Sequence, residues 1–275
     1  MPEGPEVFTS AKFLNSLFNG WLIELIHHHT TKCLKGILQG RFVPGAQIMM
    51  IRSRGKKLIF DLSNDDHLLF AYLMEGRLLI NQKPDMDAHR HFTICLYHPV
   101  SHQRTQLYYY ESRPFGGLTY CHGQNELNNA LSCVGLDLIQ DDITPAMWIS
   151  IMRTTRSKKS IAEILLNQRY LAGIGNYLRC DILYRCQIHP LEMIGTLTDE
   201  DLLRLYYATM WILSMAVQGE GLSAHTYTLP DGRLGRYQAL VYNRPVDDYG
   251  NPVAKMSLGG RTVHYVPNVQ IKKTR

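Results

Sequence analysis

The sequence lacks a run of about 18 apolar residues, which a membrane-spanning helix requires. None of its six cysteines forms a C-x-x-C pair, the spacing typical of zinc sites and redox motifs. The first residues show neither the basic nor the apolar stretch of a secretory signal, and internal repeats are absent. We therefore expect an intracellular protein with reduced cysteines and no membrane partner, nuclear or cytoplasmic according to the organism.

The composition is that of a packed protein. Of 275 residues, 45% are hydrophobic and 19% are charged, which excludes disorder for most of the chain. At about 150 residues per domain, this length favours two domains. The net charge of +5 and the isoelectric point near 8.8 weakly favour a polyanionic partner such as a nucleic acid.

Hydrophobic spacing predicts a helix over residues 3–18, because Val7, Ala11, Leu14 and Phe18 share one face. Residues 21–120 then alternate short β-like runs with turn residues, which predicts a mostly antiparallel β domain. The runs are residues 47–52, 57–62, 68–73, 78–80, 92–97 and 107–110. The more polar residues 122–142 are expected to connect two domains.

The second half of the sequence is richer in helix signals. Thr144 before Pro145 predicts a helix start, and Thr198 with Asp201 forms a capping box before the apolar pattern of residues 202–217. Two β-like runs, 238–242 and 261–266, predict a terminal hairpin joined through the turn-rich residues 247–252.

The first candidate for chemistry is the N-terminus. Methionine before a small proline is normally removed, which leaves Pro2 with a secondary amine. With a pKa of about 8, such an amine is partly neutral and nucleophilic at neutral pH. Glu3 and Glu6 beside it are candidate acids or bases. The alternative is structural: Pro2 begins a helix whose dipole the glutamates stabilise.

Three further segments are suited to phosphate. Four cations in residues 52–57 stand at a strand–turn–strand junction, residues 173–177 join a glycine turn to a helix N-terminus carrying Asn176, and Arg261 follows a two-glycine turn. A solvated hairpin, an ordinary turn and an exposed arginine without a role are the respective alternatives.

A fifth set is Met74, Arg113 and Phe115, which stand beside turn residues. An apolar or cationic side chain on a turn can act as a wedge in a base stack. Taken alone, Met74 and Phe115 fit a hydrophobic core better than a role in DNA binding. The run His27–His29 is not a metal site, because consecutive residues of a strand point to opposite faces.

Taken in order, these segments resemble the formamidopyrimidine-DNA glycosylase / endonuclease VIII family of base-excision repair enzymes. The matching motifs are Met-Pro-Glu-Gly-Pro-Glu-Val at residues 1–7, Arg-Gly-Lys-Lys-Leu at 54–58, Leu-Met-Glu-Gly-Arg at 73–77, Arg-Pro-Phe at 113–115, Gly-Ile-Gly-Asn-Tyr at 173–177, and the turn at Arg261. The resemblance extends from residue 2 to about 270. With Gly4, the N-terminal motif resembles that of the endonuclease VIII branch in particular.

The resemblance implies an α+β fold. An N-terminal β-sandwich with a leading helix would occupy residues 1–125, and a linker residues 126–142. A helical domain with a helix-two-turn-helix and a finger hairpin would follow at residues 143–275, the finger covering about 238–270. The resemblance also implies a monomer.

The family roles transfer residue by residue. Pro2 matches the nucleophile, Glu3 the catalytic acid and Lys56 an essential hairpin lysine, while Glu6 matches a supporting carboxylate. Asn176 and Arg261 match two groups that bind the phosphates beside the lesion, and Met74, Arg113 and Phe115 match a void-filling set. The sequence departs from the family at Pro114, where a second arginine is usual, and at Glu75, where serine is usual.

The finger departs further. The four positions aligned with zinc-binding cysteines hold Val246, Tyr249, Val266 and Val269. Valine cannot bind zinc. The sequence therefore resembles the zincless-finger members of the endonuclease VIII-like branch, and we expect no bound metal and apolar packing in its place.

The implied activity is that of a bifunctional DNA glycosylase and lyase acting on damaged double- or single-stranded DNA. Oxidised pyrimidines and ring-opened purines would be removed through a Schiff base on Pro2 and β,δ-elimination. No cofactor is expected, since the iminium is the electron sink. Two alternatives stay open: a non-catalytic DNA-binding protein of the same fold, which a retained Met1 would favour, and a basic RNA-binding module.

Overall fold

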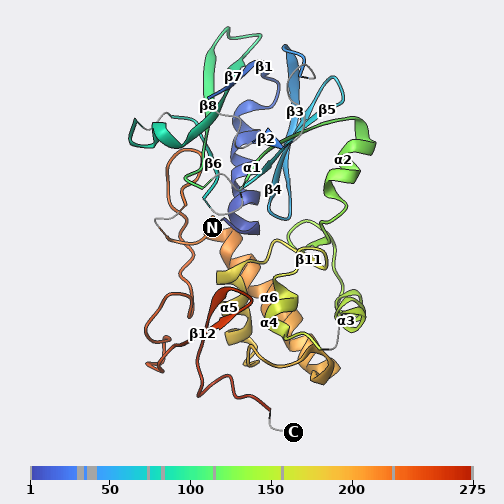
Figure 1. Cartoon of the computed structure of the whole chain (residues 1–275), viewed down its shortest axis with the longest axis vertical. Helices are drawn as coiled ribbons and strands as arrows, with labels where there is room; N and C mark the ends of the chain where they lie inside the picture. The colour runs from blue at the N-terminus through green and yellow to red at the C-terminus, as the bar shows by residue number, and fades with distance from the viewer. Residues whose placement is uncertain are drawn as a thin grey trace. The chain divides into compact units, whose positions relative to one another are not determined.

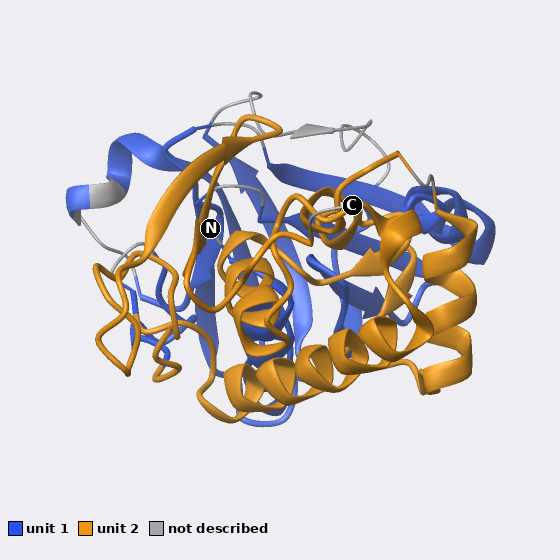
Figure 2. Ribbon diagram, turned by 90° about the horizontal axis from the view of Figure 1, so that it is seen from below, with its two compact units in different colours: residues 1–133, 224–235 blue, residues 134–223, 236–275 orange. Residues whose placement is uncertain are grey.

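The chain forms two compact units in the computed structural model, which describes residues 2–29, 34–35, 42–72, 75–81, 84–113, 116–155, 158–224 and 227–273. The first unit comprises residues 1–133 and 224–235, and the second residues 134–223 and 236–275 (Figure 2). Residues 224–235, which we expected in the second domain, therefore belong to the first unit.

The first unit begins with α1 (Gly4–Phe18), as the spacing predicts. Val7, Ala11, Leu14 and Phe18 are at most 4% exposed and form one side of the main hydrophobic core. Figure 1 shows α1 running between β6–β8 on one side and β3–β5 on the other. Pro5 occupies the first turn of the helix, whereas Pro2 lies before the N-cap residue Glu3. The helix-start role that sequence alone allowed for Pro2 is thus taken by Pro5.

Among the described residues of this unit, nine strands and one short 3-10 helix (Pro84–His89) complete the sandwich. The strands are β1 (Leu22–His28), β2 (Leu34–Lys35), β3 (Ala46–Arg54), β4 (Lys57–Leu62), β5 (Asp66–Ala71), β6 (Arg77–Leu79), β7 (Arg90–Tyr97), β8 (Arg104–Tyr110) and β9 (Gly117–His122). Their order is β2-β9-β5-β4-β3-β1-β7-β8-β6. Because β1 pairs with β3 only at Leu22 and Ile23 but with β7 along its length, the sheet divides there into two layers. The expected β-sandwich with a leading helix is confirmed.

Residues that we expected in a linker form a helix instead. The helix α2 (Gly123–Leu131) places Leu127 against Ile59, Leu69 and Cys121. Lys57 Nζ donates to the Ala130 carbonyl at 2.7 Å, which fixes the end of this helix. The polar composition of α2 hid its one buried residue, Leu127. The change of unit comes only after residue 133.

The second unit is mainly helical. Its elements are β10 (Leu136–Asp137), α3 (Pro145–Thr154), α4 (Ile161–Leu165), β11 (Leu171–Ala172), α5 (Asn176–Arg185), a 3-10 helix (Ile194–Thr196), α6 (Asp199–Gln218), β12 (Ala254–Leu258) and β13 (Arg261–Tyr265). Thr144 Oγ1 accepts from Met147 N at 3.2 Å, and Thr198 and Asp201 form the reciprocal capping box. Both predicted helix starts are confirmed.

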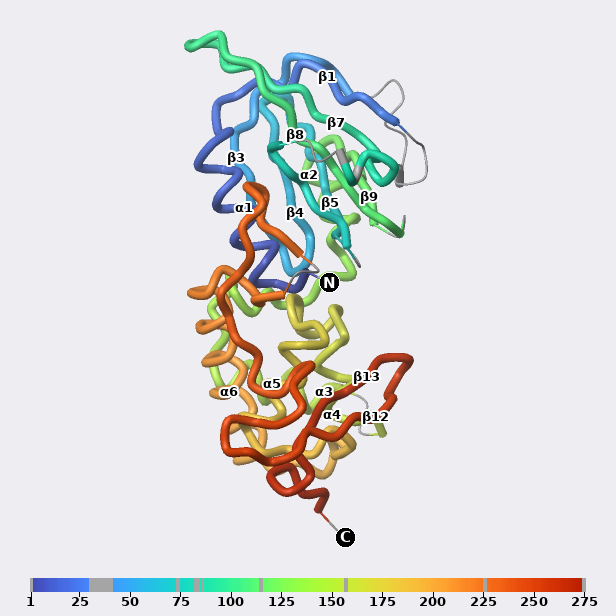
Figure 3. The backbone as a smooth tube through the Cα atoms, turned by 90° about the vertical axis from the view of Figure 1, so that its left-hand side faces the viewer, coloured from blue at the N-terminus to red at the C-terminus, as the bar shows by residue number. Residues whose placement is uncertain are grey.

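The terminal hairpin is not the expected one. β12 and β13 pair through the turn at Gly259 and Gly260, and β13 packs against α5 (Figure 3). Residues 238–242 form no strand, because Asp181 of α5 takes their backbone N–H groups. Its carboxylate accepts from Leu240 N at 3.0 Å, Val241 N at 3.0 Å and Tyr242 N at 3.3 Å, and from the Tyr237 hydroxyl at 2.9 Å.

Asp181 is completely buried, and burial raises its pKa to about 6 in spite of these hydrogen bonds. A carboxyl group with a raised pKa favours folding when it is protonated, so its contribution is largest below about pH 3.8 and is lost as the pH rises through about 6. The shift corresponds to about 3 kcal/mol.

We expect Asp181→Asn to be less stable than the wild type at every pH, because an asparagine amide turns donors toward backbone N–H groups. The deficit should widen by about 2–3 kcal/mol between pH 7 and pH 4, since only the wild type gains from protonation of this group. Urea unfolding followed by fluorescence measures both proteins. A deficit that narrows toward low pH would show that folding lowers the pKa of Asp181.

Candidate active site and DNA-contacting residues

The N-terminus of α1 buries two carboxylates next to Pro2. Glu3 is 2% exposed and Glu6 is 3% exposed. Glu3 N donates to Glu6 Oε2 at 2.8 Å, and the Glu3 side chain accepts from Glu6 N, so the pair forms a reciprocal capping box. Pro2 is buried as well. The three residues that sequence singled out thus occupy one rigid turn, with an amine-bearing residue joined directly to an acid.

Lys56 lies at the tip of the β3–β4 hairpin. Gly55 has a φ of 57°, and Lys56 is not among the residues with positive φ, which is the backbone pattern of a tight II′ turn. The strands that this turn joins pack against α1. Lys56 is half-buried, whereas the neighbouring Arg52 is paired with Asp61 at 2.5 Å. Of the four cations in residues 52–57, Arg52 is therefore paired with a carboxylate of the neighbouring strand β4.

The segment 224–235 covers part of α1. A hydrogen bond of 2.8 Å joins the Tyr227 hydroxyl to Ser10 Oγ, one turn beyond Glu6. Ile80 N donates to the Pro230 carbonyl at 2.9 Å, and Arg77 Nη1 donates to Thr228 Oγ1 at 3.4 Å. This segment is distant in sequence from α1 and β6 but is held to both.

The electrostatics here reflect a site shielded from water. Burial raises the pKa of Tyr227, and the nearby Glu6 carboxylate raises it further, so the phenol stays a neutral hydrogen-bonding group. Burial lowers the pKa of Arg77. A low local dielectric strengthens any charge interaction formed at this turn.

In the second unit, Asn176 is the first residue of α5. The preceding turn contains Gly173 with a φ of 104°, a conformation suited to glycine. The Gln168 side chain shapes this turn: its Oε1 accepts from Gly173 N at 3.0 Å, and its Nε2 donates to the Ile174 carbonyl at 2.8 Å. The helix therefore begins at a fixed point, with its N-terminal N–H groups near the Asn176 side chain.

Asn176 and Arg261 are brought together. Asn176 Nδ2 donates to the Thr262 carbonyl at 2.9 Å, which ties the start of α5 to the residue that follows Arg261. The fully buried Arg179 donates to Asn176 Oδ1 and fixes the other end of the amide. Arg261 is exposed at the hairpin turn. Two candidate phosphate ligands 85 positions apart thus lie on adjoining elements.

The expected void-filling set is described only in part. Arg113 is exposed on the segment after β8, as a side chain that enters DNA must be. Met74 and Phe115 lie outside the described residues. The core alternative for these two residues is therefore untested.

The finger positions carry no zinc donors apart from one phenol. Val266 is fully buried and packs with Cys180, Val241 and Val263, and Val269 packs beside them. Tyr249 is 86% exposed and Val246 is 39% exposed, so our expectation of apolar packing was wrong for these two. Asp247 between them accepts from Tyr249 N, Asn251 N, Asn251 Nδ2 and the Tyr184 hydroxyl at 2.8–2.9 Å. The four side chains do not fit a zinc ion.

Comparison with known proteins gives the family. The sequence model of the formamidopyrimidine-DNA glycosylase N-terminal domain matches residues 1–118, and that of the formamidopyrimidine-DNA glycosylase H2TH domain matches residues 134–228. The chain belongs to the formamidopyrimidine-DNA glycosylase family. Among its relatives, the formamidopyrimidine-DNA glycosylase of Listeria innocua is 30% identical over 98% of this chain and all of its own, and that of Bacillus cereus strain ZK is 31% identical over 98% of this chain and 99% of its own.

Solved structures of the family have the same fold. MutM (Fpg) from Thermus thermophilus aligns with a TM-score of 0.85 at 26% identity, covering 99% of this chain and all of its own. Lactococcus lactis Fpg in complex with DNA containing an abasic site aligns with a TM-score of 0.86 at 27% identity, covering 98% of this chain and all of its own. The expected class, a DNA glycosylase with abasic-site lyase activity that acts on DNA, is confirmed. In the part of the chain that the structure describes, no helix is long and apolar enough to cross a membrane.

Two functional contacts were missed in the sequence. The anchoring of Tyr227 to Ser10 joins residues 217 positions apart, and no local pattern indicates it. The buried Arg179 stands one turn after Asn176, which is the spacing of same-face helix neighbours. That spacing was visible in the sequence and would have indicated a partner for Asn176.

We expect Tyr227→Phe to loosen the segment 224–235, because the change removes one buried hydrogen bond worth about 1 kcal/mol. Trypsin should then cut faster after Arg233 or Arg236, with mass spectrometry locating the cut. Tyr249→Phe is the matched control, since this tyrosine is 86% exposed. Equal cleavage of all three proteins would show that the Ser10 contact does not hold the segment.

Proposed function

We propose that this glycosylase removes oxidised pyrimidines and ring-opened purines through the amine of Pro2. The observation that carries the proposal is the turn in which Glu3 and Glu6 are buried and bonded to each other's backbone beside Pro2. A nucleophile joined to a fixed acid is what glycosidic bond cleavage with amine capture requires. The damaged nucleotide is turned out of the duplex before the reaction.

In the proposed reaction, Pro2 N attacks C1′ while Glu3 delivers a proton to the sugar ring oxygen. The bond from C1′ to the base breaks and the base leaves with the bonding pair. The amine proton passes to the departing base, the C1′–O4′ bond breaks as the ring oxygen is protonated, and the nitrogen lone pair forms the C1′=N iminium. The iminium makes the C2′ proton acidic. Its removal expels the 3′ phosphate by β-elimination, and δ-elimination then expels the 5′ phosphate.

The remaining candidates bind DNA. We assign Lys56, Asn176 and Arg261 to phosphates beside the lesion, and Met74, Arg113 and Phe115 to the space that the extruded nucleotide leaves. The Asn176–Thr262 hydrogen bond supports this assignment, because it holds two of these groups on adjoining elements. Glu6 supports the acid by fixing Glu3 N.

We further assign the chain to the zincless-finger members of the endonuclease VIII-like branch. Gly4 and the apolar packing of Val266 and Val269 support this assignment.

Glu3→Gln should abolish excision of a damaged base but keep much of the cleavage of a preformed abasic site, since that substrate has no base to expel. Pro2→Gly keeps an α-amine without the ring and should be slower in both steps. Borohydride trapping on duplexes with one lesion measures the covalent intermediate, and gel assays measure excision.

The wild type must cross-link to damaged DNA in the same assay. Equal excision by Glu3→Gln and wild type would remove Glu3 from the mechanism. N-terminal sequencing that finds Met1 retained would remove Pro2 as the nucleophile.

Elemental analysis should find no stoichiometric zinc, and a chelator should leave excision unchanged, because the finger positions hold no zinc donors apart from one phenol. Chelator-sensitive excision would overturn the zincless assignment.

Arg261→Ala should weaken binding to damaged DNA while changing the free energy of unfolding by about 0.5 kcal/mol or less, as expected for an exposed side chain.

A further inference from the structure

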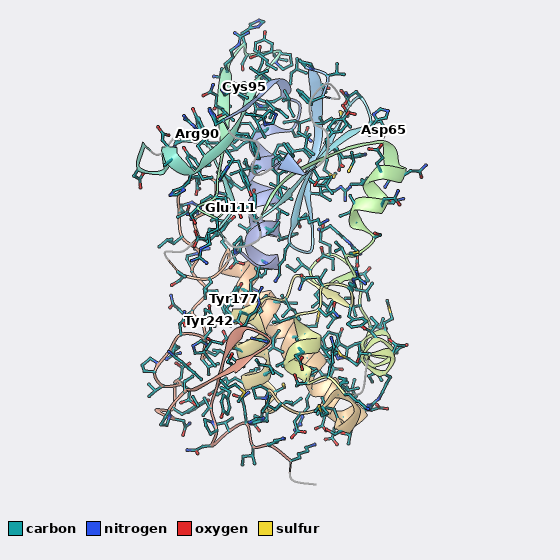
Figure 4. All side chains as sticks on the ribbon, viewed as in Figure 1. Asp65, Arg90, Cys95, Glu111, Tyr177 and Tyr242 are labelled. Carbon is teal, nitrogen blue, oxygen red and sulfur yellow. The ribbon has the colours of Figure 1, made fainter. Side chains whose placement is uncertain are left out.

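A buried carboxylate closes the segment that carries Arg113 and Phe115. Glu111 is 1% exposed and labelled in Figure 4. Both of its oxygens accept from Gly116 N at 3.0 Å, so its side chain bridges the two ends of the segment 111–116. Its backbone is held as well, since Glu111 N donates to the His89 carbonyl at 3.0 Å and His91 Nε2 donates to the Glu111 carbonyl at 2.7 Å.

One phenol connects this carboxylate with the strand before Met74. Tyr109 is fully buried, and its hydroxyl donates to Glu111 Oε2 at 3.1 Å. The same hydroxyl lies 3.4 Å from the carbonyl of Ala71, the last residue of β5. A single oxygen atom thus contacts the ends of both segments that carry candidate void-filling residues.

Glycines make this contact possible. A Cβ at Gly116 would lie 2.2 Å from the Ala71 carbonyl oxygen and 2.7 Å from the Tyr109 hydroxyl. A Cβ at Gly76 would lie 2.6 Å from the same hydroxyl and 3.1 Å from Tyr72 Cα. Since Tyr109 is fully buried in the core, its ring has no room to withdraw. Both segments therefore require glycine where they return past this phenol.

A second contact links the two segments directly. Ser112 Oγ donates to the Glu75 carboxylate. Glu75 is the residue that departs from the serine usual in the family, and here it bonds to the neighbour of Arg113. The residues around Met74 and those around Arg113 are therefore coupled by two separate hydrogen-bonded contacts.

We propose that Tyr109 and Glu111 are positioning residues that hold the segments carrying Met74, Arg113 and Phe115 as one unit, so that the void-filling side chains enter DNA together. The proposal rests on the proposed function, in which these side chains replace an extruded nucleotide. Neither Tyr109 nor Glu111 touches DNA in this scheme. Their effect is confined to substrates in which there is a base stack to maintain.

The test compares one lesion in duplex DNA with the same lesion in a single strand. Tyr109→Phe removes the bridging hydroxyl, and Glu111→Gln replaces an acceptor pair with an amide. Each should lower kcat/KM on the duplex about tenfold, as the loss of one buried hydrogen bond allows. On the single strand both should stay within about twofold of the wild type, because no void forms there.

A 2-aminopurine placed opposite the lesion reports insertion by its fluorescence in the duplex. The fluorescence change given by the wild type should be smaller or slower in both variants. If the enzyme does not process single strands, this measurement alone tests the proposal. Tyr120→Phe is the matched control, because Tyr120 donates to the buried Asp66 at the opposite end of the β5–β9 pair and should behave as wild type.

Equal losses on duplex and single strand, or an unchanged 2-aminopurine signal in both variants, would overturn the proposal. Ser112→Ala gives an independent reading if Tyr109→Phe does not fold, and its insertion signal should fall in the same direction. Failure of the proposed function is distinguishable, because then the wild type itself would neither excise the lesion nor give a borohydride adduct.

Discussion

The N-terminal turn of this enzyme depends on the pair of hydrogen bonds between Glu3 and Glu6. Each glutamate side chain accepts from a backbone N–H that has no partner within the helix. The two acidic side chains are therefore both buried and hydrogen-bonded beside Pro2. Removal of either carboxylate would leave one backbone N–H at the start of α1 without its acceptor. In the proposed mechanism, the carboxylates that hold this turn together are also the ones assigned to catalysis.

The second unit uses the same device on a larger scale. Asp181 organises residues 237–242 and Asp247 organises residues 247–251, each by accepting several backbone N–H groups. A charged acceptor makes stronger hydrogen bonds than a neutral one, and a buried carboxylate with several donors can fix an irregular segment. These two carboxylates and the Val241–Val263–Val266 cluster hold this irregular part of the second unit in place.

Sequence predicted what is local and missed what is distant. The helix over residues 4–18 and the starts of α3 and α6 follow from spacing and caps within a few residues. The strand expected at 238–242 was wrong because a carboxylate nearly sixty positions away takes its N–H groups. At the N-terminus, the sequence alone places Pro2, Glu3 and Glu6 in one turn because they are neighbours in the chain. The Asn176–Thr262 and Ser10–Tyr227 contacts were not predicted, because only the folded chain brings them together.

Residues 224–235 return to the first unit after the chain has already entered the second unit. The chain crosses from one unit to the other three times, after residues 133, 223 and 235. Residues 224–235 are anchored at Ser10 on α1 and at Ile80 beyond β6, and the chain on both sides of them belongs to the second unit. Because Tyr227 is bonded to Ser10, one turn beyond Glu6, a residue 217 positions away in the chain stabilises the helix whose first turn holds Glu3 and Glu6.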